Sequence, residues 1–292
     1  MKQQALKIPA VAEAAKRISA RYIAGEKASA AVALVAANRG RGHLGSIECV
    51  GESVRDADVA ERETQEFLRL AGSLAQLDEK PTLSFDLSHV GSVVSPETGL
   101  HSARRIAKAA RDAGTSIMIS AEGSGRTDLV LDLYEALSTE FPETGVTLQA
   151  RLHRTPKDLS RLLSLPGPIR LVKGAFLEPL DVAYARESAE LTEAYLDLAA
   201  VLVEAQHRVN LATHDADLVA VLQARLGESL KQEHVEFEML QGLGPELLDR
   251  LRDEGHRTRE YVVYGPQWWL YVLNRMAEHP ERVLQALADL WP

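Results

Sequence analysis

The feature that most constrains this sequence is a regular alternation. Short β-type runs and runs with helical periodicity follow one another roughly every 30 residues. Between the candidate strands, apolar residues keep the spacing of one buried helix face, as in Ala103, Ile106, Ala107 and Ala110 of a helix beginning near His101. Strict alternation with eight strands predicts a closed (β/α)₈ barrel of the TIM type rather than an open sheet. The candidate strands are 43–50, 82–87, 116–120, 146–150, 169–172, 209–212, 235–240 and 260–264.

The length agrees with one barrel. The chain has 292 residues, and barrels of this kind commonly use about 250 residues in a single domain. We therefore expect one domain over residues 1–292, with residues 1–40 as an N-terminal helical extension. Leu247, Leu248 and Leu251 predict a helix that ends before Gly255.

Charge and targeting signals narrow the range of partners. The net charge of −9 argues against a nucleic-acid partner. A single cysteine, Cys49, excludes an intrachain disulfide and fits a reducing compartment. The longest apolar stretch, near 30–37, is far short of the roughly 20 residues of a transmembrane helix, and the N-terminus lacks the apolar core of a signal peptide. We expect a soluble, cytoplasmic protein without a transmembrane segment.

Polar side chains gather where the predicted strands end, which is where barrel enzymes place their chemistry. This clustering indicates an enzyme. The residues concerned are Asp86, Ser88, Ser120, Glu122, Gln149, Arg151, Lys173, Thr213, His214, Asp215, Glu238, Gln241 and Tyr264.

Several of these residues have a structural interpretation as well. Asp215 could cap the following helix, and His214 could be a core histidine. Lys173 could be a Schiff-base lysine, a phosphate anchor or a surface lysine. The nine histidines include no H-x-x-x-H or H-x-H pair, so no metal site is expected. No G-x-G-x-x-G follows a strand, so a Rossmann cofactor site is not supported.

Four segments in the same order resemble the proline dehydrogenase family. They are R-L-V-K-G-A-F-L-E-P at 170–179, A-T-H-D at 212–215, V-E-F-E-M-L-Q-G at 235–242 and Y-V-V-Y-G at 261–265. Trp268, Tyr271, Arg275 and Glu278 follow with the spacing of the family's substrate helix. Each segment alone is weak evidence, but together they resemble the family strongly.

The resemblance implies a (β/α)₈ barrel that holds FAD noncovalently and removes a hydride from the carbon beside the nitrogen of proline. It places Gln149 and Arg170 beside the isoalloxazine ring, where a fixed cation stabilises the reduced flavin. It places Lys173 at the pyrophosphate, where an acidic protein needs a local cation. The other residues that it assigns to the cofactor are Gly174, Ala175, Thr213, His214, Asp215 and Glu236, of which Thr213, His214 and Glu236 would line the phosphate, ribose and adenine end.

The substrate side departs from the family pattern. Asp86 stands where typical members carry a lysine, and Ser120 stands where they carry an aspartate. Phe176 replaces a tyrosine, Asn274-Arg275 replaces an arginine pair that binds the carboxylate of proline, and Val263 replaces a proline. The chamber is therefore less cationic, and an arginine–carboxylate pair is hard to replace with asparagine.

These departures lead us to expect a small amine, imino acid or hydrazine-type substrate, oxidised at a C–N or N–N bond, rather than free L-proline. Asp86 would anchor a cationic nitrogen or take its proton; alternatively, it pairs structurally with Arg126 or Arg151. Glu278 would orient Arg275. The residues expected to surround the substrate are Asp86, Leu171, Phe176, Tyr261, Tyr271 and Arg275.

Three other functions stay open from the sequence. The chain could be a genuine L-proline dehydrogenase with a rearranged carboxylate clamp. It could be a flavin-binding protein that has lost catalysis, or a Schiff-base lyase that uses Lys173. The sequence leaves the electron acceptor, quinone or oxygen, undetermined.

Overall fold

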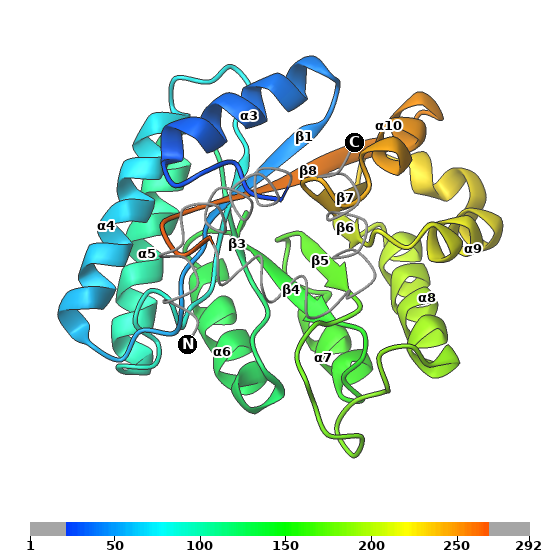
Figure 1. Ribbon diagram of the computed structural model, residues 1–292. Helices are drawn as coiled ribbons and strands as arrows, with labels where there is room; N and C mark the ends of the chain where they lie inside the picture. The colour runs from blue at the N-terminus through cyan, green and yellow to red at the C-terminus, as the bar shows by residue number, and fades with distance from the viewer. Residues whose placement is uncertain (1–21, 269–292) are drawn as a thin grey trace, which may run out of the picture.

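The structure, a computed structural model, describes residues 22–268. Eight parallel strands close into a barrel in the order β1 to β8, and β8 pairs with β1. Helices surround the strands (Figure 1), which confirms the predicted (β/α)₈ barrel. The strands are β1 Leu44–Cys49, β2 Thr82–Phe85, β3 Ile117–Ile119, β4 Gly145–Gln149, β5 Ile169–Val172, β6 Val209–Ala212, β7 Val235–Leu240 and β8 Arg257–Tyr264.

Strand β8 begins earlier than its apolar pattern predicts. The sequence predicts a start at residue 260, but the strand begins at Arg257. Arg257 and Arg259 both form ion pairs with Glu236 of the neighbouring strand β7, at 3.1 and 2.7 Å. These cross-strand pairs extend the ladder through residues that look too polar for a strand.

The helices begin at capping residues that apolar spacing alone does not reveal. Helix α5 starts at Pro96, earlier than the predicted position near His101, because the Ser95 Oγ accepts a hydrogen bond from the Thr98 amide at 3.1 Å. Its predicted apolar face is buried as expected. The helices are α3 Ala28–Gly40, α4 Ala57–Leu74, α5 Pro96–Asp112, α6 Thr127–Ser138, α7 Thr155–Leu162, α8 Ala189–Glu204, α9 Ala216–Leu226 and α10 Pro245–Asp253, with short 3₁₀ turns at Ser124–Arg126 and Gly227–Lys231.

Helix α3 covers the seam where the barrel closes. It precedes β1 in the chain, yet it packs against both β1 and β8 (Figure 1). Gly45 of β1 allows this close approach, because a Cβ atom there would lie 2.7 Å from a methyl carbon of Val35. Part of the predicted N-terminal extension is therefore a helix of the barrel wall.

The two faces of the barrel wall differ in chemistry. Residues that face the helices are apolar and fully buried, among them Ile47, Phe85, Leu171 and Phe237. Residues that alternate with them face the barrel axis, and many of these are polar or charged. The hydrophobic core thus lies between strands and helices, while the axis holds a polar network that leads to the carboxyl ends of the strands.

Candidate active site

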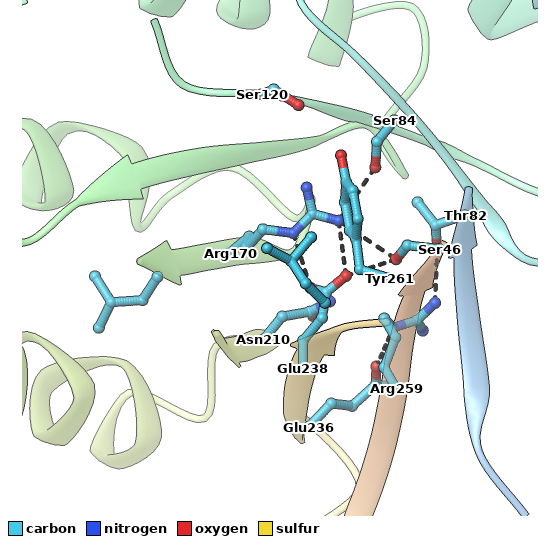
Figure 2. A network of polar contacts seen from close by, with 12 residues as sticks. Ser46, Thr82, Ser84, Ser120, Arg170, Asn210, Glu236, Glu238, Arg259 and Tyr261 are labelled. Atoms are coloured by element: carbon cyan, nitrogen blue, oxygen red, sulfur yellow. Dashed lines mark hydrogen bonds and ion pairs between the residues drawn. The ribbon is translucent and has the colours of Figure 1, made fainter. Parts of the chain in front are cut away.

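The lowest polar layer of the barrel lies near the amino ends of the strands. Glu236, the second residue of β7, pairs with Arg259, and the Arg259 guanidinium also donates to the Gly45 carbonyl and to Thr82 Oγ1. The side chain of Glu236 therefore lies below the barrel centre (Figure 2). This corrects the expectation that Glu236 lines the adenine end of a cofactor, because the edge at which barrel enzymes bind ligands is at the other end of its strand.

The middle layer centres on an ion pair between Arg170 of β5 and Glu238 of β7. The guanidinium donates two hydrogen bonds to the carboxylate, each 2.8 Å, and both side chains are almost fully buried. Ser46 and Asn210 also donate to this carboxylate, at 2.7 and 2.9 Å. The guanidinium further donates to Ser84 at 3.1 Å (Figure 2). Five strands thus converge on one buried salt bridge.

The protonation of this pair follows from its partners. Burial acts to raise the pKa of Glu238, but the Arg170 guanidinium, with help from Arg259 and Ser46, more than offsets it and holds the pKa below its ordinary value. The Arg170 guanidinium also lies under the ring of Tyr261, 4.6 Å from its centroid. Arg170 therefore connects the middle layer to the aromatic residue above it.

The upper layer contains an acid that sequence reasoning missed. Tyr261 Oη donates a hydrogen bond to Glu48 Oε2, and Ser120 Oγ donates to the same oxygen at 3.3 Å. Glu48 lies on β1, in a run that otherwise reads as a buried strand. The sequence did carry a signal for Glu48. It lies two positions after Ser46, so both side chains are on the face of β1 that points into the barrel.

Asp86 follows β2 at the same edge and is partly exposed. Burial, and then the negative charges of Glu48 and Glu122, raise the pKa of Asp86 well above its usual range, while His89 acts in the opposite direction. The two arginines that the sequence offers as ion-pair partners of Asp86 make other contacts instead. Arg126 pairs with Glu122 at 2.5 Å, and the Arg151 guanidinium donates to the backbone carbonyls of residues 176 and 184. The structural ion-pair explanation of Asp86 is therefore wrong.

Replacing Asp86 with asparagine is expected to stabilise the protein increasingly as pH rises. The folded state holds the Asp86 proton to a higher pH than the unfolded chain does, so wild-type stability falls between the ordinary and the raised pKa. Each pH unit between the two values corresponds to about 1.4 kcal/mol. Thermal unfolding from pH 4 to 8 measures this. Asp78→Asn, at an exposed loop position, is the control, and parallel profiles for wild type and Asp86→Asn would refute the assignment.

Gln149, at the carboxyl end of β4, has an unusual contact pattern. Its side chain is 4% exposed, and its Nε2 donates to the Glu122 carbonyl at 2.9 Å. Its Oε1 is buried without a hydrogen-bond partner in the described part of the chain. Nearby Gly174 has φ +111°, and a Cβ atom there would lie 3.0 Å from this oxygen and 2.8 Å from the Arg151 side chain. A side chain at position 174 would therefore clash with Arg151 and Gln149, and the buried, unpartnered Gln149 Oε1 is an acceptor suited to a ligand's donor.

The ends of β5 and β6 are linked by an ion pair. Lys173 Nζ lies 2.6 Å from Asp215 Oδ2, while Asp215 Oδ1 accepts hydrogen bonds from the amides of residues 217 and 218 and caps α9. The capping interpretation of Asp215 is thus confirmed. Thr213 is buried, and its Oγ1 accepts a hydrogen bond from the Asp215 amide. His214 Nε2 accepts one from the Leu240 amide at 3.0 Å.

Other predicted residues lie elsewhere. Leu171 faces the helix layer, fully buried, rather than the substrate chamber, because it alternates with Arg170 along β5. Tyr264 likewise faces outward and donates to Glu66 of α4. Phe176 lies in the loop after β5, 42% exposed, and the Ala175 carbonyl in that loop accepts from Arg186. The predicted residues Tyr271, Asn274, Arg275 and Glu278 lie outside the described residues.

Two further observations concern ligands and surroundings. Within residues 22–268 there is no group of three or more histidine, cysteine, aspartate or glutamate side chains arranged to hold a metal ion. None of the helices in the same range combines the length and the hydropathy that a bilayer-spanning segment needs.

Comparison with known proteins connects this geometry to one family. The family model described as proline dehydrogenase matches residues 31–278. A proline dehydrogenase of Deinococcus radiodurans is 32% identical over 269 residues, which cover 90% of this chain and 86% of that protein. Proline dehydrogenase 1 of Bacillus subtilis is 29% identical over 262 residues, which cover 89% of this chain and 86% of that protein.

A solved structure supports the same fold. Proline utilization A (PutA) from Bdellovibrio bacteriovorus, inactivated by N-propargylglycine, superposes with a TM-score of 0.82 at 22% identity over 89% of this chain. The chain spans only 32% of the length of that protein. At this level of identity the likeness concerns the barrel alone.

Proposed function

Because this chain belongs to the proline dehydrogenase family, we propose that it oxidises the CH–NH bond of L-proline. Members of this family are oxidoreductases that act on CH–NH bonds and bind FAD noncovalently. The match of the family model over residues 31–278 carries the proposal. Relatives at 26 to 32% identity that cover most of this chain are named proline dehydrogenase, and this favours L-proline over the other amines that the sequence suggested.

The residues at the carboxyl edge fit a flavin. The unpartnered Gln149 Oε1 is a buried acceptor suited to an N–H donor of the isoalloxazine ring. A side chain at Gly174 would clash with Gln149 and Arg151, so glycine there keeps Gln149 in place, and Lys173 and Arg170 supply cations. We assign Gln149 and Arg170 to the ring and Lys173, Gly174, Ala175, Thr213 and His214 to the rest of the cofactor. The assignment of Asp215 is structural, through its cap and its pair with Lys173.

Oxidation of this bond removes a hydride and a proton from the substrate. A hydride leaves the carbon beside nitrogen, a proton leaves the nitrogen, and a C=N bond forms. FAD supplies the hydride acceptor when bound. The Arg170 guanidinium keeps a positive charge at a fixed position in the barrel without reorganisation, and we assign Asp86 to the substrate nitrogen. Tyr261, held by Glu48, forms part of the chamber wall. Tyr271, Arg275 and Glu278 are proposed substrate residues from the sequence alone.

A second candidate substrate is favoured by the acidic chamber. Glu48 and Glu122 lie close enough to Asp86 to raise its pKa, and Arg126 and Arg170 are both paired with carboxylates. Such a chamber suits a cyclic amine without a carboxylate better than it suits an amino acid anion. Pyrrolidine is the simplest compound of this kind.

Anaerobic flavin reduction distinguishes these candidates. We expect the purified protein to show the visible absorption of oxidised flavin and to lose it on addition of L-proline. Pyrrolidine is the matched compound that lacks only the carboxylate. Faster bleaching by pyrrolidine would favour the second candidate. A protein that cannot be loaded with FAD would contradict both, and a loaded protein that neither compound reduces would be consistent with loss of catalysis.

A further inference from the structure

Glu238 has no role in the chemistry above, yet its carboxylate in the barrel axis accepts four hydrogen bonds. Its carboxylate is 2% exposed. It accepts two hydrogen bonds from Arg170, one from Ser46 and one from Asn210. All four hydrogen bonds are donated to the carboxylate, so it is held in its ionised form.

The orientation of Arg170 depends on this carboxylate. Arg170 Nε and one of its terminal nitrogens both bond to Glu238, which fixes the plane of the guanidinium. The hydroxyls of Ser84 and Ser46 support the same terminal nitrogen at 3.1 and 3.3 Å. The ring of Tyr261 stacks against the guanidinium. Figure 2 shows the Arg170 guanidinium beside that ring, with Glu238 below the guanidinium.

The Arg170–Glu238 ion pair also sets the net charge in the middle layer of the barrel. An unpaired Arg170 would present a full positive charge to whatever binds at the carboxyl edge, whereas the pair is neutral overall. In a poorly solvated interior such a charge acts over several ångströms with little screening. A reduced flavin carries more negative charge than an oxidised one, so the charge nearby shifts its reduction potential.

We propose that Glu238 is a positioning residue that fixes the Arg170 guanidinium and, by neutralising it, lowers the reduction potential of the bound flavin. This inference rests on the proposed function, since it requires FAD near Arg170. Glu238 acts through Arg170 and does not itself touch the substrate.

The test is the midpoint potential of the FAD-loaded Glu238→Gln variant, measured by anaerobic spectral titration against a reference dye. Glutamine keeps the size and an acceptor oxygen but removes the negative charge. The potential is expected to become more positive, with at least about a tenfold change in the reduction equilibrium, equivalent to about 30 mV for a two-electron couple.

Glu236→Gln is the matched control. Glu236 is a buried, arginine-paired glutamate two positions earlier on the same strand, in the layer farther from the carboxyl edge. Its replacement is expected to lower stability without moving the potential. Equal shifts in both variants, or none in Glu238→Gln, would overturn the inference.

Glu238→Asp keeps the test decisive if Glu238→Gln does not fold. Aspartate retains the charge but reaches less far, so weaker FAD retention with an unchanged potential is expected. A positive shift in Glu238→Asp would contradict a role for the charge. Failure of wild type to bind FAD would instead contradict the proposed function, so the two failures are distinguishable.

Discussion

Arg170→Met is expected to lower the free energy of unfolding by about 3–5 kcal/mol, because it leaves the buried Glu238 carboxylate without its cation. Ser46 and Asn210 would still donate to that carboxylate, but two neutral donors do not replace a bidentate guanidinium. Denaturant unfolding followed by far-ultraviolet circular dichroism measures the loss. We also expect weaker FAD retention, since the cation beneath Tyr261 is removed.

A double variant separates the charge from the packing. Arg170→Met combined with Glu238→Met removes both ions and is expected to recover most of the lost stability, because an apolar pair of similar volume avoids the cost of a lone buried charge. Arg161→Met is the surface control. Arg161 pairs with Asp132 and Glu135 while 39% exposed, so we expect a cost below about 1 kcal/mol. Equal costs at the two arginines would show that the buried pair has no special role.

Asp86→Lys is expected to raise kcat/KM for L-proline at least tenfold and to lower that for pyrrolidine. The change removes a carboxylate from a chamber that already contains Glu48 and Glu122 and adds a cation for the substrate carboxylate. One unit charge about 4 Å away is worth about 4 kcal/mol at an effective dielectric of 20, whereas a tenfold effect needs only about 1.4 kcal/mol. Steady-state kinetics with the two compounds gives both values.

Two further variants test whether the charge in the chamber causes these changes in kcat/KM. Glu204→Lys makes the same charge change at an exposed position at the end of α8 and should leave both kinetic constants unchanged. Adding Asn274→Arg to Asp86→Lys is expected to raise proline oxidation further, by restoring a second cation. If wild type and Asp86→Lys oxidise L-proline equally well, the acidic chamber does not determine substrate choice.

The position of each element along the chain was accessible from the sequence. The period of the apolar residues predicted every strand of the barrel, and the starts of β8 and α5 were displaced because cross-strand arginine pairs and the Ser95 cap are not apolar signals. Clustering of polar residues at strand ends predicted the edge that carries the site. These are local properties, which depend on neighbours within a turn or a strand.

Contacts between distant strands were decided by tertiary structure alone. Glu236 and Glu238 look equivalent in the sequence, yet one lies near the amino end of the barrel and the other holds Arg170 at its centre. Glu48 reads as an ordinary strand residue, and nothing local links it to Tyr261 until the closing of β1 on β8 brings the two together. Leu171 faces outward because Arg170 faces inward. The stagger of a closed barrel sets which side chains share a layer, and no local pattern encodes that register.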